Sequence, residues 1–173
     1  MEEKIIEIGR RPAIDTIKEK LGTNLIGAEI GVNKGYNASY ICNIIQPKLL
    51  YLIDPWDNFF DPASGEIIGE VQYLMAQDLL KSFSCCKIIR KISLEAVKDI
   101  PDENLDFVYI DADHSYNAVL SDCISWYPKI KKGGILSGHD FTISSIQEAV
   151  KLFCQKIRIN KLYSNEDWWI FKT

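Results

Sequence analysis

The stretch Asn24–Ser39, NLIGAEIGVNKGYNAS, decides the fold of this chain. It starts with a nearly continuous apolar run from Leu25 to Val32, which is typical of a strand buried on both faces. Gly31 and Gly35 mark a tight turn, and a helical pattern follows. A buried strand that enters a turn and then a helix presents backbone N–H groups to a bound ligand. We therefore predict a cofactor site at this turn.

Composition indicates one soluble globular domain. The 173 residues are 47% hydrophobic and 25% charged, with a net charge of −4 and no run of Lys or Arg. Nucleic acid is a poor candidate partner for such a chain. The N-terminus has neither a signal-peptide core nor a membrane span, so we expect a cytoplasmic protein with no membrane partner. We predict a single domain over residues 1–173, in which residues 1–23 form a leading helical segment.

The five cysteines are an odd number and show no spacing typical of metal ligands. Cys42, Cys123 and Cys154 fall on the apolar faces of predicted helices. We interpret these three as small hydrophobic residues in a reducing compartment.

Strand and helix patterns alternate along the chain. Strands are expected at residues 25–32, 49–53, 86–92, 106–110, 135–138, 157–163 and 168–171. Helices are expected at residues 12–21, 36–45, 68–83 and around 146–154. A further helix is expected to begin at residue 93, and another to begin at residue 116 and end at Gly133-Gly134. Such alternation favours a mostly parallel sheet covered on both faces. The predicted fold is α/β: a Rossmann-like, seven-stranded, mostly parallel sheet with helices on both faces and an antiparallel C-terminal strand.

Polar side chains follow several of these strands. They are Glu29, Asp54, Ser93, Asp111 and Asp140. Ligands of parallel sheets bind beyond the carboxyl ends of the strands, so these residues are candidates for one site. Pyrophosphate is disfavoured as the ligand, because a dinucleotide fingerprint would need glycine at Asn33 and Tyr36, and the P-loop sequence is absent.

These motifs resemble the class I S-adenosylmethionine-dependent methyltransferases. The resemblance rests on the glycine turn EIGVNKG, the acidic strand end at Asp54, Ser93, and the stretch IDADHSYNAVLSDCISWYPKIKKGGILSGHDF from Ile110 to Phe141. This last stretch is similar to the metal-dependent sugar O-methyltransferases of macrolide and aminocoumarin biosynthesis. It is more distantly similar to catechol and caffeoyl-CoA O-methyltransferases.

The resemblance implies S-adenosylmethionine as cofactor. The implied binding residues are Glu29, Gly31, Asn33, Gly35, Asn37, Asp54, Ser93 and Asp111. Among them, Asp54 would accept hydrogen bonds from the two ribose hydroxyls, and Ser93 would lie near the adenine. Structural explanations stay open: the two glycines permit a turn, Asp54 before Pro55 suits a turn, and Ser93 suits a helix cap.

The resemblance also implies a Mg²⁺ site, or a site for another divalent cation. Asp111 and Asp140 match ligand positions, and His139 stands where relatives carry a carboxylate, so it is the third candidate ligand. A metal would acidify an acceptor hydroxyl, and a base would remove its proton. His114 is the favoured catalytic base and Asp113 the alternative. The alternative to a catalytic role is structural: His114 would only form hydrogen bonds at the start of the following helix.

The predicted function is therefore an O-methyltransferase that acts on a hydroxyl of a sugar, glycan or other small metabolite. Two alternatives are a catalytically silent module that binds S-adenosylmethionine or S-adenosylhomocysteine, and a nicotinamide-dependent dehydrogenase. Little chain is left to build a substrate-binding cap, so we expect a possible homodimer. The aromatic segment Trp56–Phe60 either forms a lid over the cofactor or packs onto its own domain.

Overall fold

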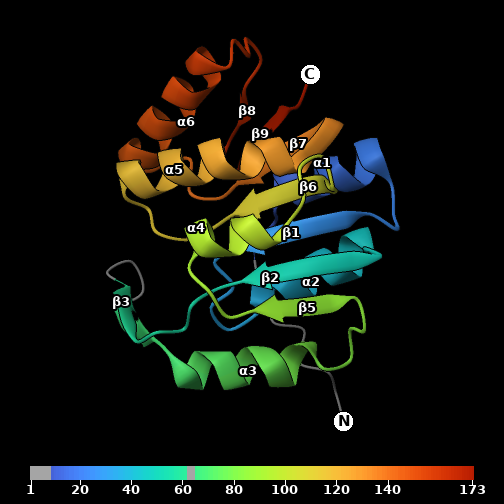
Figure 1. Ribbon diagram of the computed structural model, residues 1–173, viewed down its shortest axis with the longest axis vertical. Helices are drawn as coiled ribbons and strands as arrows, with labels where there is room; N and C mark the ends of the chain where they lie inside the picture. The colour runs from blue at the N-terminus through green and yellow to red at the C-terminus, as the bar shows by residue number, and fades with distance from the viewer. Residues whose placement is uncertain (1–8, 62–64) are drawn as a thin grey trace.

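A seven-stranded sheet forms the centre of the molecule (Figure 1). The structure is a computed structural model that describes residues 9–61 and 65–173. The strands are β1 (Ile26–Ile30), β2 (Leu49–Ile53), β5 (Cys86–Ile89), β6 (Leu105–Ile110), β7 (Ile130–Gly138), β8 (Tyr163–Ser164) and β9 (Trp168–Phe171). Their spatial order is β5-β2-β1-β6-β7-β9-β8, and β9 is antiparallel to both of its neighbours while the other pairs are parallel. The predicted fold class is confirmed.

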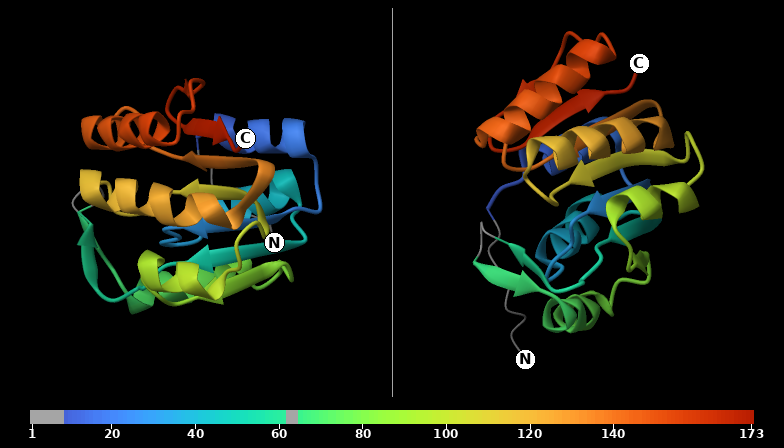
Figure 2. Two further views of the ribbon diagram at one scale, coloured as in Figure 1. Left: turned by 45° about the horizontal axis from the view of Figure 1, so that its top comes forward. Right: turned by 60° about the vertical axis from the view of Figure 1, so that its left-hand side comes forward.

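Helices cover both faces of this sheet (Figure 2). One layer holds α1 (Pro12–Leu21), α2 (Tyr36–Ile45) and α3 (Glu70–Leu80), and the other holds α4 (Ser93–Ala96), α5 (Tyr116–Trp126) and α6 (Ser144–Lys156). Short 3-10 turns, η1 (Val97–Asp99) and η2 (Tyr127–Lys129), follow α4 and α5. Each layer encloses its own apolar core against the sheet.

The central strand β6 shows why the sequence runs are so apolar. Phe107 and Tyr109 enter the core under α1 and α2, whereas Val108 and Ile110 enter the core under α5 and α6. Because both faces of β6 are buried, its sequence does not alternate between apolar and polar residues. Gly27 of β1 lies beside Phe107, and a Cβ at Gly27 would lie 2.1 Å from that ring. A glycine is therefore needed where the large ring crosses the neighbouring strand.

A small antiparallel hairpin, β3 (Phe59–Asp61) and β4 (Glu66–Ile68), replaces the loop expected between the second strand and its helix. The segment Trp56–Phe60 does not behave as one unit. Trp56 is 1% exposed, and its Nε1 donates to the carbonyl of Asn33. Its ring packs against that of Tyr73, with 5.0 Å between the two ring centroids. Phe59 and Phe60, in contrast, are exposed. A lid that includes Trp56 is thus excluded by its burial.

Two predicted helices differ from the structure. The helix expected to run to Gly133 ends at Trp126, because η2 contains Pro128 and the chain then enters β7, within which Gly133 takes a positive φ of 81°. The helix predicted at 68–83 is shorter, since α3 spans Glu70–Leu80, and its apolar residues Val71 and Met75 are exposed. The buried side is that of Ala76, whose backbone lies against Gly35.

The C-terminal hairpin is shorter than expected. The strand predicted for residues 157–163 is reduced to β8, because Ile157 and Ile159 donate their backbone N–H groups to carbonyls at the end of α6. Over residues 9–61 and 65–173, no helix has the length and apolar character needed to cross a membrane.

Candidate active site

A large pocket opens at the carboxyl ends of the parallel strands. Its volume is about 1070 Å³, and the turns after β1, β2 and β6 line it together with the hairpin β3–β4 and the first residues of α4 and α5. The order of the strands reverses between β1 and β6, which is where ligands of open α/β sheets bind. Of the five polar residues expected at one site, Glu29, Asp54, Ser93 and Asp111 line this pocket, whereas Asp140 does not.

The glycine turn brings the two central strand ends into contact. Gly31 has a φ of 86°, and a Cβ at this position would lie 2.0 Å from the carbonyl oxygen of Asp111. Any side chain would therefore separate the loops after β1 and β6. Gly35 has a φ of 84° and caps α2. The turn keeps its backbone N–H groups near the pocket because both positions are glycine.

Asp54 holds this turn through backbone hydrogen bonds. Its Oδ2 accepts from the N–H groups of Val32 and Asn33, both at 2.9 Å, and its Oδ1 accepts from the N–H of Trp56 at 3.0 Å. The carboxylate is 6% exposed and still borders the pocket. A carboxylate has about four acceptor sites, so a ligand hydroxyl can add to these three bonds. Asp54 therefore stabilises the turn, and it keeps a hydrogen-bond acceptor site for a ligand in the pocket.

Arg11 and Glu29 both line the pocket and are connected through Asn37. Asn37 donates from Nδ2 to Oε1 of Glu29 at 2.9 Å and accepts at Oδ1 from Nε of Arg11 at 3.4 Å. Glu29 is 1% exposed, and its Oε2 has no hydrogen-bond partner among the described residues. Burial raises the pKa of Glu29 well above its usual range, and the hydrogen bond from Asn37 only partly offsets this. Arg11 was not predicted, because it is distant in sequence from every motif.

The opposite wall contains Ser93 and a buried acid that sequence reasoning missed. The hydroxyl of Ser93 donates to Oδ1 of Asp122 and accepts from Nε1 of Trp126 at 2.8 Å. Ser93 makes no capping bond, since the N-cap of α4 is Ile92, so its interpretation as a helix cap was wrong. Burial raises the pKa of Asp122 to about 6, against the lowering effect of the Ser93 hydrogen bond. Asp122 and Ser93 both line the pocket.

A carboxylate and imidazole cluster lies where β6 and β7 end. Nε2 of His114 is 3.8 Å from Oδ1 of Asp111 and 3.3 Å from Oδ2 of Asp140, and the three ligand atoms lie within 4.8 Å of one another. A cavity of about 10 Å³, room for one water-sized occupant, adjoins Asp111 and His114. Asp113 is exposed, and its Oδ1 accepts from the N–H of Ser115 at 2.7 Å. Of the two candidate bases, only His114 belongs to this cluster.

His139 lies behind the cluster. Its Nδ1 is 2.8 Å from Oδ1 of Asp167, and its Nε2 is 3.5 Å from Oδ1 of Asp140. Asp167 is fully buried and also accepts from the hydroxyl of Tyr109 and the N–H of Ala13. Burial lowers the pKa of His139, but the hydrogen bond with Asp167 and the nearby carboxylates outweigh it, so the net shift is upward. The structure places His114, rather than the predicted His139, with the two carboxylates.

Comparison with known families decides the classification of the chain. Residues 28–141, which hold the glycine turn, Asp54, Ser93 and the acidic cluster, match the family described as a methyltransferase domain. The chain belongs to the methyltransferase domain family. The membership predicted from the motifs is thereby confirmed.

Solved structures share the fold of this methyltransferase domain. The O-methyltransferase NovP superposes with a TM-score of 0.71 at 13% identity, covering 94% of this chain and 78% of that one. An O-methyltransferase from Bacillus cereus, in complex with SAH, gives 0.66 at 10% identity, over 96% and 84% of the two chains. An rRNA methylase from Streptococcus thermophilus also has this fold, with a TM-score of 0.64 at 12% identity, over 94% and 96%.

A curated relative extends well beyond this methyltransferase domain. The uncharacterized protein y4gI from Sinorhizobium fredii is 24% identical over 116 residues, which are 65% of this chain. The matched chain spans about 12% of the length of that relative.

Proposed function

We propose that this methyltransferase domain transfers a methyl group from S-adenosylmethionine to a hydroxyl group of a sugar, glycan or other small metabolite. The observation that carries the proposal is the pairing of Arg11 and Glu29 through Asn37 at one end of the large pocket. An amino acid zwitterion needs a cation for its carboxylate and a carboxylate for its ammonium. Arg11 would supply the first, and Glu29 would supply the second when the ammonium group takes the place of its proton. A phosphate-bearing dinucleotide would not need the buried Glu29.

The cofactor fits the residues present along the pocket. The free Oε2 of Glu29 would accept from the ammonium group of the methionine part, and Arg11 would bind its carboxylate. Asp54 would accept from the ribose hydroxyls with the capacity that its backbone bonds leave. Gly31, Asn33 and Gly35 would leave room for the sulfonium chain. Ser93 and Asp122 would lie beside the adenine.

The reaction is an in-line displacement at the methyl carbon. The bond from sulfur to methyl breaks, a bond from the acceptor oxygen to methyl forms, and S-adenosylhomocysteine leaves without the sulfonium charge. The acceptor hydroxyl must lose its proton during this step. We assign that proton to Nε2 of His114, because His114 lines the pocket and this nitrogen lies beside Asp111 and Asp140. The two carboxylates stabilise the imidazolium that results.

The carboxylates of Asp111 and Asp140 also fit a divalent cation. Two oxygen donors suit Mg²⁺ or Mn²⁺, and His114 would then stay outside the coordination sphere so that its Nε2 can act as the base. Such a cation would lower the pKa of the acceptor hydroxyl. Nε2 of His139 would then orient Asp140, while Asp167 fixes the imidazole through Nδ1 of His139.

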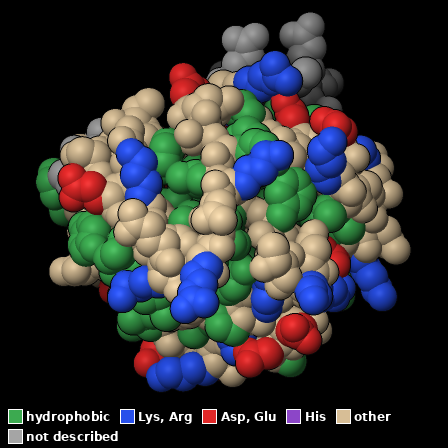
Figure 3. All heavy atoms as spheres, turned by 90° about the horizontal axis from the view of Figure 1, so that it is seen from above, with side chains coloured by type: hydrophobic (Ala, Val, Ile, Leu, Met, Phe, Trp, Pro, Cys, Tyr) green, Lys and Arg blue, Asp and Glu red, His purple; other side chains and the backbone are tan. Residues whose placement is uncertain are grey.

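A small hydroxyl acceptor is favoured over RNA. The net charge is −4, and Figure 3 shows basic side chains interspersed with acidic and uncharged ones on the face that it displays. A continuous basic surface is what an RNA substrate would need. The free state of all five cysteines fits a reduced, cytoplasmic location.

Two measurements test the proposal in sequence. Titration calorimetry with S-adenosylhomocysteine should show binding of one equivalent, and failure to bind would end the cofactor assignment. Transfer of labelled methyl groups to a metabolite and glycan extract should then depend on His114 and Asp111. We expect His114→Ala and Asp111→Asn to reduce transfer by 100-fold or more, on the order of a lost general base. Asp113→Asn is the matched control and should keep activity. Binding without any transfer would favour a silent binding module instead.

A further inference from the structure

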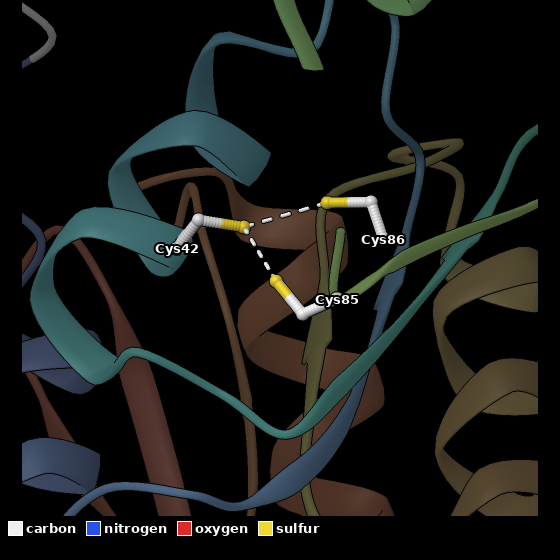
Figure 4. A group of neighbouring side chains, drawn as sticks. All are labelled: Cys42, Cys85 and Cys86. Carbon is white, nitrogen blue, oxygen red and sulfur yellow. Dashed lines mark hydrogen bonds between the residues drawn. The ribbon is translucent and has the colours of Figure 1, made fainter. Parts of the chain in front are cut away.

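Three thiols meet at the amino end of the edge strand β5, away from the carboxyl ends of the strands where the pocket opens. Cys42 lies near the end of α2, Cys85 lies in the turn directly before β5, and Cys86 is the first residue of β5 (Figure 4). The Sγ of Cys42 is 3.5 Å from the Sγ of Cys86 and 3.8 Å from the Sγ of Cys85. The three sulfur atoms lie within 4.8 Å of one another, and Figure 4 shows them pointing toward a common point. None of these residues lines the large pocket.

The backbone holds this arrangement. The N–H of Leu50 donates to the carbonyl of Cys85 at 2.9 Å, and the N–H of Cys86 donates to the carbonyl of Phe83 at 3.1 Å. Cys86 also pairs with Leu50 in the register between β2 and β5. Cys42 is 4% exposed on the buried side of α2. The sulfur atoms are therefore brought together by fixed elements, and a ligand would find them already placed.

The distances between the sulfur atoms are those of a tetrahedral metal centre. Zinc binds thiolates at about 2.3 Å, so two sulfur ligands of a tetrahedral zinc lie about 3.8 Å apart. The separations of 3.5 and 3.8 Å from Cys42 agree with this value. They are far longer than the roughly 2.05 Å of a disulfide bond. Simple apolar packing would not require sulfur at all three positions, since Ala or Val fills such space as well.

We propose that Cys42, Cys85 and Cys86 bind one thiophilic divalent cation, with Zn²⁺ as the natural occupant. Three thiolates supply three tetrahedral positions, and the partial exposure of Cys85 and Cys86 leaves the fourth open to solvent. The hard cation Mg²⁺ is excluded, because the cluster contains no oxygen or imidazole ligand among the described residues.

A bound ion would join α2 to the edge strand β5. The strand β5 has β2 as its only partner among the described strands. The same helix α2 carries Asn37, the residue between Arg11 and Glu29, at its other end. The proposed ion is therefore a structural support behind the pocket. It does not depend on the proposed reaction, because neither cofactor nor acceptor touches the three thiols.

Cobalt substitution tests the site directly. Titrating the reduced full chain with Co²⁺, under anaerobic conditions, should produce the sulfur-to-cobalt charge-transfer band of thiolate coordination at one equivalent. Zn²⁺ should abolish the band, and Mg²⁺ should leave it unchanged. The second cluster of Asp111, His114 and Asp140 contains no sulfur, so it cannot produce this band. Cys42→Ser and Cys86→Ser should lose the band, whereas Cys154→Ser, a buried cysteine outside the cluster, should keep it.

A second measurement covers the case in which a variant does not fold. In the wild-type chain, Zn²⁺ should slow alkylation of the half-buried Cys85 and Cys86 and should raise the melting temperature with increasing ion concentration. The absence of a charge-transfer band in the folded wild type would overturn the proposal. So would a band that persists in Cys86→Ser, or a chain whose thiols form a disulfide without taking up the ion.

Discussion

At the scale of single residues, Glu29 gives the sharpest test of cofactor binding. It is a buried carboxylate with one oxygen bonded to Asn37 and the other without a partner among the described residues. We expect Glu29→Gln to weaken the binding of S-adenosylhomocysteine by about 10- to 100-fold, because a hydrogen bond to a charged group contributes roughly 1.5–3 kcal/mol. Titration calorimetry measures this. The Asp113→Asn chain should bind normally, and unchanged affinity in Glu29→Gln would contradict the assignment.

Asp122 predicts how stability depends on pH. Its pKa in the folded chain is about 6, compared with an ordinary value of 3.8, because burial disfavours the charged form. A raised acid pKa stabilises the fold below the ordinary value, and this contribution is lost as pH rises through about 6. A pKa shift of about two units corresponds to a contribution of roughly 3 kcal/mol to the free energy of unfolding.

The Asp122→Asn variant isolates this contribution. We expect the unfolding free energy of the variant, relative to that of the wild type, to rise by roughly 3 kcal/mol between about pH 4 and pH 7. The amide oxygen of Asn can still accept from Ser93, so the hydrogen bond is kept. Urea unfolding at several pH values measures the difference. A difference that does not vary with pH would show that Asp122 titrates normally.

Single residues were predictable where they follow a strand and unpredictable where only the fold places them. Glu29 and Asp111 stand at the ends of apolar runs, so their position at the rim follows from the parallel sheet. Arg11 lies outside every motif, whereas Asp122 lies within the stretch 110–141 but was given no role there, so only the packing of the fold shows that both line the pocket. The same holds for Cys42 and Cys86, since 43 residues separate them.

At the scale of secondary structure elements, the turn before the hairpin β3–β4 contributes a side chain to the core, whereas the hairpin itself exposes most of its apolar side chains. Trp56 is buried against Tyr73, whereas Phe60 is 58% exposed on β3. We expect Trp56→Ala to lower the free energy of unfolding by about 3–5 kcal/mol, the usual cost of removing a buried aromatic side chain. Phe60→Ser should change it by less than about 0.5 kcal/mol. Urea denaturation distinguishes the two, and equal effects would contradict this division.

Elements were predictable where periodicity extends over many residues. The bounds of α1, α2 and β2 agree with the sequence patterns, because the two helices have apolar residues at helical spacing and β2 is a continuous apolar run that ends before Asp54-Pro55. The strands β3 and β4 have three residues each, too few for a period to emerge. The end of α5 was placed too late, because the helical spacing of apolar residues continued past Pro128 into the strand β7.

At the scale of the whole molecule, exposed apolar side chains gather on two neighbouring elements. Phe59, Phe60 and Ile67 belong to the hairpin, and Val71, Leu74 and Met75 belong to α3, which follows it directly. Large exposed apolar groups on one part of a surface are typical of an interface. Phe59 and Ile68 of the same hairpin also line the pocket. These residues support the homodimer expected from the sequence, with the hairpin near the mouth of the pocket.

A charge on the hairpin tests this association. Ile67 is 58% exposed and lies opposite Phe60 in β4, so Ile67→Glu should not disturb the core. In a symmetric dimer, the substitution would bring a desolvated carboxylate from each copy to the interface, where burial of an unpaired charge is costly. We expect light scattering to give a dimer mass for the wild type and a monomer mass for Ile67→Glu, while Ile124→Glu, an equally exposed apolar position on α5, stays dimeric. A monomeric wild type at working concentrations would remove the dimer, and the hairpin would then be free to contact the methyl acceptor alone.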